Sequence, residues 1–176
     1  MRVRLPPETH SMKKIYIAIS IGALICLSAA ILLYKQKMNE AHQEFSSDEL
    51  YELINTYRKE NGREILRISS ELEKSASEKV TDMIQKNYWD HNESIDNTVW
   101  KFIKDAGFDF SYAGENLAKD MTMEKDILEA WKLSEKHNKN LLDNSFTDMG
   151  LASQCNIQFQ GKKTCLIVLH LGKKKQ

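Results

Sequence analysis

The stretch SYAGENLAKD, residues 111–120, places a single carboxylate between a glycine and a short apolar step. Ala113 and Gly114 predict a small turn, Glu115 follows the turn directly, and Leu117 begins a strand-like segment. These residues alone leave two interpretations open. Glu115 either lies on a surface turn that leads into a strand, or it points into a pocket.

The segments around this stretch predict helices first and an antiparallel hairpin last. The first helix begins at Ser46, where Ser46 and Glu49 have capping-box spacing, and it ends at Asn61-Gly62. Further elements follow in chain order: a helix from about Ser70 with the same spacing to Glu73, a loop over 87–97, a short helix over 97–108, a helix over 120–137, a turn region over 138–146, and strands over 147–159 and 163–172. This order is typical of an α+β domain with helices packed on a small sheet.

A charge-free apolar segment over residues 15–34 precedes this domain. Twenty residues at about 1.5 Å per residue span about 30 Å, the thickness of a bilayer core. Basic residues cluster before the segment, which predicts a cytoplasmic tail over 1–14, a transmembrane helix or signal anchor over 15–34 and a juxtamembrane linker over 35–45. The alternative is a signal peptide cleaved near Ser28-Ala29-Ala30, which would give a secreted protein.

Two of the three cysteines, Cys155 and Cys165, lie in the part predicted to be exported, where oxidation is the default. They flank a predicted strand–turn–strand segment, which favours a cross-strand disulfide over two free thiols. Cys26 lies inside the apolar segment, and its simplest interpretation is a small membrane-buried residue.

Three loop or element-end positions carry side chains that can do chemistry: His91, Glu115 and His137. Each is a weak signal when taken singly. The sequence contains no HExxH zinc motif, no GxSxG elbow and no phosphate-binding GxxxxGK[ST] loop. The formal net charge is zero, so bulk electrostatics does not favour nucleic-acid binding.

Taken together, these motifs resemble the CAP superfamily (cysteine-rich secretory proteins, antigen 5 and pathogenesis-related 1), also called the SCP domain. The resemblance covers about residues 46–171. It rests on the order of four segments, NTYRKENGR, YWDHNES, SYAGENLAKD and AWKLSEKHNKNLLDNSFTDMGLA, and on the residues Gly114, Glu115, Asn116, Trp131, Ser134, His137, Asn140, Leu141, Leu142, Phe146 and Gly150. It implies a bacterial-type CAP domain over residues 46–176.

The fold implied by the resemblance is a three-layer α-β-α sandwich, in which two histidines and two glutamates face a common cleft. By motif, His91 matches the first histidine, Glu115 the glutamate of the GEN turn, and His137 the second histidine. The fourth member is left unassigned, because no glutamate stands at the corresponding place between the first histidine and the GEN turn. The nearest acidic residues are Glu93, Asp96 and Asp105. His170, on the last strand, is expected to be a paired strand residue rather than a ligand.

The resemblance also implies divalent-metal binding in the cleft and lipid binding near it. Zn²⁺ fits two imidazoles and a carboxylate, with His91, His137 and Glu115 as the predicted ligands. The favoured function is a membrane-anchored binding or interaction module for a lipid or cell-surface ligand, in preference to an enzyme. The alternatives are a metal-dependent, peptidase-like hydrolase of cell-surface material and a vestigial site on a structural domain.

Overall fold

A computed structural model describes residues 23, 25–35, 45–92, 94 and 98–175. The chain divides into two compact units, residues 1–43 and residues 44–176. In the first unit the described residues, 23 and 25–35, are helical. Among the described residues, no helix is both long and apolar enough to cross a membrane. The predicted tail over 1–14, residues 15–22 and 24 of the predicted anchor and nearly all of the predicted linker lie outside the described residues.

The second unit is a mixed α+β domain, as the sequence predicts. Its elements are α2 (Ser47–Glu60), β1 (Arg67–Ile68), α3 (Ser70–Lys86), α4 (Val99–Asp105), β2 (Phe110–Lys119), α5 (Glu124–Leu133), α6 (Glu135–Leu142), β3 (Asp148–Phe159) and β4 (Lys162–Lys174). Both long helices begin at a serine whose hydroxyl accepts a backbone N–H, which is the standard N-cap. The cap of α2 is Ser46, as predicted, but the cap of α3 is Ser69 rather than Ser70.

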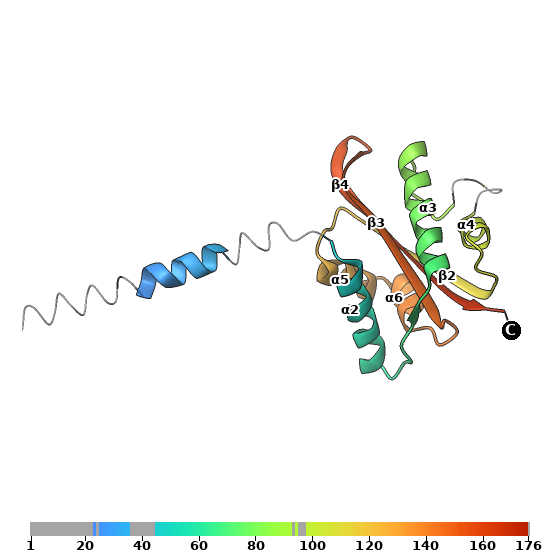
Figure 1. Ribbon diagram of the computed structural model, residues 1–176, viewed down its shortest axis with the longest axis horizontal. Coiled ribbons are helices and arrows are strands. Elements are labelled where there is room, and N and C mark those ends of the chain that lie inside the picture. The colour runs from blue at the N-terminus through green and yellow to red at the C-terminus, as the bar shows by residue number, and fades with distance from the viewer. Residues whose placement is uncertain (1–22, 24, 36–44, 93, 95–97, 176) are drawn as a thin grey trace, which may run out of the picture. The chain divides into compact units, whose positions relative to one another are not determined.

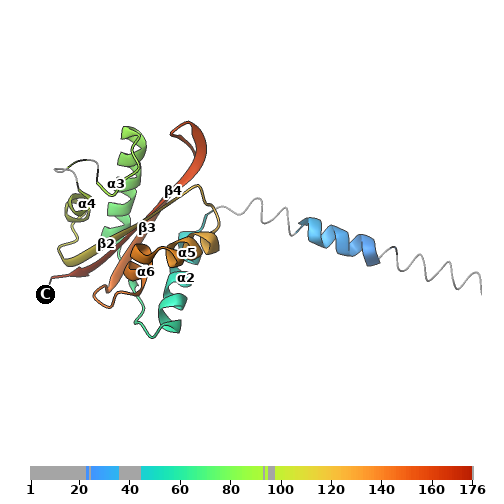
Figure 2. The same ribbon diagram turned by 180° about the vertical axis from the view of Figure 1, so that it is seen from behind.

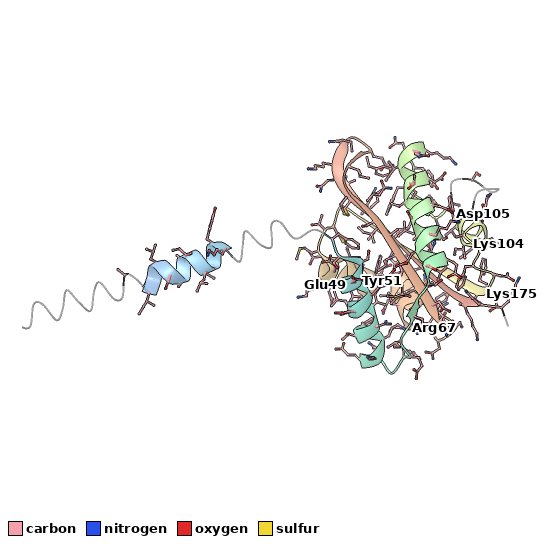
Figure 3. The ribbon with its side chains drawn as sticks, viewed as in Figure 1. Glu49, Tyr51, Arg67, Lys104, Asp105 and Lys175 are labelled. Atoms are coloured by element: carbon pink, nitrogen blue, oxygen red, sulfur yellow. A yellow bond between two sulfur atoms is a disulfide. The ribbon has the colours of Figure 1, made fainter. Side chains whose placement is uncertain are left out.

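The four strands form one sheet in the order β1-β3-β4-β2. The predicted hairpin of β3 and β4 is its centre, β2 pairs antiparallel with β4, and the short β1 pairs parallel with β3. Strand β1 was not predicted, because two residues are too few to show a strand pattern. Arg67 secures β1 by a bidentate contact with Asp148, with N–O distances of 3.1 and 3.2 Å (Figure 3).

Helices cover both faces of the sheet, with α3 and α4 on one side and α2, α5 and α6 on the other (Figures 1 and 2). Alternation along β4 divides the core between the two faces. Leu166 and Val168 pack with residues of α3, whereas Ile167 and Leu169 pack with residues of α2, α5 and α6. This is the three-layer arrangement that the family resemblance implies.

The sequence prediction was wrong in two places near the predicted site. The segment over 120–146 contains two helices, α5 and α6, which are separated at Ser134, so residues 138–142 are helical rather than a turn. Gly114 and Glu115 lie inside the ten-residue strand β2, not at a turn before it. The glycine before Glu115 favours a turn when the local sequence is considered alone. Backbone pairing with β4 instead makes Gly114 and Glu115 part of a strand.

The predicted disulfide between Cys155 and Cys165 is present and bridges β3 and β4. Tyr51 of α2 ties the helix to the same hairpin, because its hydroxyl accepts the backbone N–H of Leu151 at 2.6 Å (Figure 3). The hairpin is therefore held both covalently and by the helix layer that packs on it.

Candidate functional site

Glu115 lies on β2, the edge strand, and only 5% of its surface is exposed. It faces the α3 side of the sheet, as do Leu117, two residues along β2, and His170, its register partner on β4. Gly114 precedes it at a close approach, since a Cβ at this position would lie 2.6 Å from the Phe146 ring. The motif therefore combines a glycine required by packing with a carboxylate that is inside the protein.

Both carboxylate oxygens of Glu115 are engaged by histidines. His91 Nδ1 lies 2.6 Å from Oε1, and His170 Nε2 lies 2.9 Å from Oε2. Burial alone would raise the pKa of the Glu115 carboxyl, but the hydrogen bonds from His170 and His91 outweigh this effect and lower the pKa below its usual value. Glu115 is thus an ionised carboxylate held by two imidazole donors.

His170 extends this network into the core. Its Nδ1 lies 2.8 Å from the hydroxyl of Ser75 on α3, while its Nε2 forms the hydrogen bond to Glu115. With Glu115 ionised, Nε2 donates to its carboxylate, and in that tautomer Nδ1 accepts a hydrogen bond from the Ser75 hydroxyl. Serine, histidine and glutamate are connected here as in hydrolase triads, but both Ser75 and His170 are completely buried. A substrate has no access to this hydroxyl, so the arrangement is structural.

His91 brings the network to the surface. It follows α3 in the loop before α4, and half of its side chain is exposed. The hydrogen bond to Glu115 raises the pKa of His91 despite the opposing effect of partial burial. Because Nδ1 donates to Glu115, the second ring nitrogen, Nε2, carries the lone pair of the neutral imidazole. A carboxylate on one ring nitrogen is the usual way to orient a histidine that binds a metal through the other.

His137 lies on α6, and the polar residues of the GEN motif tie this helix to β2. Asn116 donates to the backbone carbonyl of His137 at 3.1 Å, and Asn140 donates to the carbonyl of Glu115 at 3.1 Å and to the side chain of Asn116 at 2.9 Å. Burial lowers the pKa of His137, and the charge of His91 lowers it further. His137 is therefore within electrostatic range of His91, and its neutral form is favoured.

The structure brings His91 and Glu115 into direct contact, with His137 close enough to be affected by the charge on His91. Sequence reasoning missed the two other members, His170 and Ser75. The only signal for His170 was its position between Leu169 and Leu171, which suggested a paired strand residue. Among the described residues, no three His, Cys, Asp or Glu side chains are grouped so that they could hold a metal ion. The three-ligand zinc site stays a prediction.

The profile of one protein family matches residues 51–168, which include His91, Glu115, His137 and Ser75 and end two residues before His170. It describes CAP, the cysteine-rich secretory protein family. The chain belongs to the CAP family. The match covers most of the second unit, and it confirms the family that the GEN motif and its flanking histidines indicate.

Two curated relatives come from Bacillus subtilis. The CAP domain is 38% identical over 100 residues to the protein YkwD, covering 57% of this chain and 39% of YkwD. It is 28% identical over 109 residues to the membrane protein YlbC, covering 62% of this chain and 32% of YlbC. The matched region is therefore well under half the length of either relative.

Solved structures share the fold. An outer surface protein from Borrelia burgdorferi has a TM-score of 0.64 and 23% identity, covering 73% of this chain and 92% of its own. An extracellular protein containing a SCP domain from Bacillus anthracis has a TM-score of 0.62 and 24% identity, covering 72% of this chain and 40% of its own. At these identities the similarity establishes the CAP fold and nothing finer.

Proposed function

We propose that this CAP domain is an extracytoplasmic binding module that holds a divalent metal ion, Zn²⁺ in the first instance, through His91 and His137. The observation that carries this proposal is the contact between His91 Nδ1 and the buried Glu115 carboxylate, while half of the His91 side chain is exposed. Glu115 has the role of an orienting residue, because both of its oxygens are already bonded to imidazoles.

The donor chemistry fits such an ion. Neutral imidazole is a preferred Zn²⁺ ligand, and the lowered pKa of His137 keeps it neutral at pH 7. The orienting carboxylate on His91 raises the basicity of the ligating nitrogen. Two protein ligands leave positions for donor atoms from outside, such as a carboxylate on a cell-surface ligand. An incomplete ligand set of this kind suits recognition better than the permanent holding of a structural metal.

A location outside the cytoplasm is supported by three observations. The chain belongs to a secretory protein family, its Cys155–Cys165 disulfide suits an oxidising compartment, and residues 15–34 form a charge-free apolar segment. The similar protein YlbC is itself described as a membrane protein. We propose that residues 15–34 anchor the domain with residues 1–14 in the cytoplasm. Release by signal-peptide cleavage is the alternative.

A metal-dependent hydrolase is the second candidate. It needs a third protein ligand or a general base beside the metal, and Glu115 is the nearest carboxylate to His91. Using Glu115 in either role would break one of its histidine hydrogen bonds and leave a buried group unpaired. This cost favours the binding module. Lipid binding remains a prediction from the family resemblance alone.

Isothermal titration of the full chain with Zn²⁺ tests the proposal. We expect one site in the parent chain, loss of that site in His91→Ala and in His137→Ala, and a 10- to 100-fold weaker affinity in Glu115→Gln. The matched control is His42→Ala, which changes a histidine outside the family match and should leave binding unchanged. Zn²⁺ affinity that is the same in His91→Ala and the parent would refute the site.

A further inference from the structure

Lys79, on α3, is a lysine with no exposed surface. Burial of an ammonium group is costly unless its donors are satisfied, and lysine is among the residues least often found fully buried. A methionine would fill similar space without this cost. The charge at this position therefore calls for a reason beyond packing.

The Lys79 ammonium is directed at the segment that carries His91. Its Nζ donates to the backbone carbonyls of Asp90 and His91, at 2.9 Å each, and to the hydroxyl of Tyr88 at 3.0 Å. That hydroxyl in turn donates to Asp82 on α3 at 2.7 Å. Among the described residues, the ammonium thus donates to three oxygens that lie within four residues of the chain.

Aromatic rings shield this ammonium. Nζ lies 4.7 Å from the centre of the Tyr88 ring and 5.5 Å from that of Phe102 on α4. Removal from water strengthens hydrogen bonds and cation–π contacts alike. The loop that carries His91 is consequently fastened at two successive carbonyls, which fixes the backbone from which the imidazole projects.

Ser75 and Lys79 are four residues apart, so they lie on the same face of α3. Ser75 contacts the ring of His170, and Lys79 holds the backbone of His91. These are the two histidines that bind Glu115. Residues on one face of α3 therefore contact both of the histidines that hydrogen-bond to the buried carboxylate.

We propose that Lys79 is a positioning residue for His91: its buried ammonium clamps the carbonyls of Asp90 and His91, and this clamp keeps His91 Nδ1 on Glu115. The inference deepens the proposed function, and its significance for metal binding rests on that function. The clamp itself is a statement about hydrogen bonds that is testable without any metal.

Proton NMR of the full chain in detergent micelles provides the test. The parent should show two strongly downfield imidazole N–H signals, from His91 Nδ1 and from His170 Nε2, each hydrogen-bonded to Glu115. Lys79→Met should remove the His91 signal and retain the His170 signal, and Lys79→Arg, which restores a cation with donors, should recover at least part of it. Lys74→Met, which changes an exposed lysine on the same helix, should retain both signals.

Retention of the His91 signal in Lys79→Met would overturn the proposal. Loss of both signals would also overturn it, because Lys79 would then support the core in general. If Lys79→Met does not fold, the parent chain decides the matter through couplings across the hydrogen bonds: Nζ should couple to the carbonyl carbons of Asp90 and His91, and absence of both couplings would refute the clamp.

Zn²⁺ titration of the same variants separates this inference from the proposed function. We expect affinity to fall 10- to 100-fold in Lys79→Met, the usual effect of losing a supporting contact. If the parent binds no Zn²⁺ while the His91 signal still depends on Lys79, the metal proposal fails and the clamp stands. If the parent binds Zn²⁺ while the His91 signal does not depend on Lys79, the inference fails and the metal proposal stands.

Discussion

At the scale of single residues, Glu115 concentrates the chemistry of the site. A buried carboxylate is stable only when its charge is paired and its oxygens are hydrogen-bonded. His91 and His170 engage both carboxylate oxygens by hydrogen bonds, one from a surface loop and one from the central hairpin. The same interactions that make Glu115 tolerable inside the protein also fix the orientation of His91.

Glu115→Gln should destabilise the domain by about 1.5–3 kcal/mol, the usual cost of losing a hydrogen bond to a buried charged group. The glutamine amide has one acceptor oxygen where the carboxylate has two. One histidine N–H can still donate to this oxygen, but the other then faces an NH₂ group that cannot accept a hydrogen bond. Urea denaturation of the full chain, followed by tryptophan fluorescence, measures the loss. Glu52→Gln, on the exposed side of α2, is the control and should change little. Equal stability of both variants would contradict the buried-charge account.

The two surface histidines should titrate on opposite sides of the ordinary histidine pKa of about 6.5. Hydrogen bonding to Glu115 raises the pKa of His91, whereas burial lowers the pKa of His137. NMR titration of the ring protons checks this order, and Glu115→Gln should lower the pKa of His91. The reverse order, with His137 titrating at the higher pH, would contradict the described geometry.

The pH dependence of the domain's stability follows from the directions of the pKa shifts of His91 and Glu115. The stabilisation linked to protonation of His91 is fully present below its unfolded-state pKa and is lost as pH rises through its raised folded-state pKa. The contribution of Glu115 has the opposite dependence, since its folded-state pKa is lowered: it is present above the unfolded-state pKa and lost as pH falls through the folded-state pKa. Denaturation of the parent chain across pH 3–9 should show both changes.

At the scale of elements, packing sets the boundaries that local sequence leaves ambiguous. Capping serines and amphipathic spacing made α2 and α3 predictable. Ala113 and Gly114 were predicted as a turn before Glu115 because glycine favours turns, yet pairing with β4 over nine register positions makes them part of β2. Likewise, Ser134 breaks the predicted helix into α5 and α6, which local helix propensity does not reveal.

Gly150 shows how closely α3 approaches β3. A Cβ at this position would lie 2.2 Å from the backbone nitrogen of Glu73 and 2.3 Å from the carbonyl carbon of Leu72. Gly150→Ala should therefore cost about 3 kcal/mol or more, since backbone atoms have to move. Gly62→Ala is the comparison, because Gly62 has open space around it. Alanine at this position should cost only the strain of a positive φ, about 1 kcal/mol. Thermal denaturation giving equal losses would contradict the close helix–strand contact.

The β3–β4 hairpin should depend on its disulfide. In the chain-entropy model, a bridge across ten positions contributes about 2–3 kcal/mol to the free energy of unfolding. Denaturation with and without a reductant measures this contribution in the full chain. The double variant Cys155→Ser, Cys165→Ser should already be destabilised and should not respond to the reductant. A parent chain that is equally stable when reduced would contradict a structural role for the bridge.

At the scale of the whole molecule, the site is assembled from segments far apart in the sequence: α3 and its following loop, β2, α6 and β4. The family resemblance made His91, Glu115 and His137 predictable, because each lies in a recognisable motif. It did not reveal His170, Ser75 or Lys79. Their roles arise from register and helix facing: β4 places His170 opposite Glu115, and α3 places Ser75 and Lys79 over that strand pair.

The central claim is that Glu115 orients His91 and that His91 and His137 together hold the metal. A crystal structure of the domain soaked in Zn²⁺ tests it most directly. We expect the ion on Nε2 of His91 and on His137, with Zn–N distances of about 2.0–2.1 Å, while His91 Nδ1 remains hydrogen-bonded to Glu115. An ion bound to the Glu115 carboxylate, or imidazole nitrogens more than about 6 Å apart in the soaked crystal, would contradict the account.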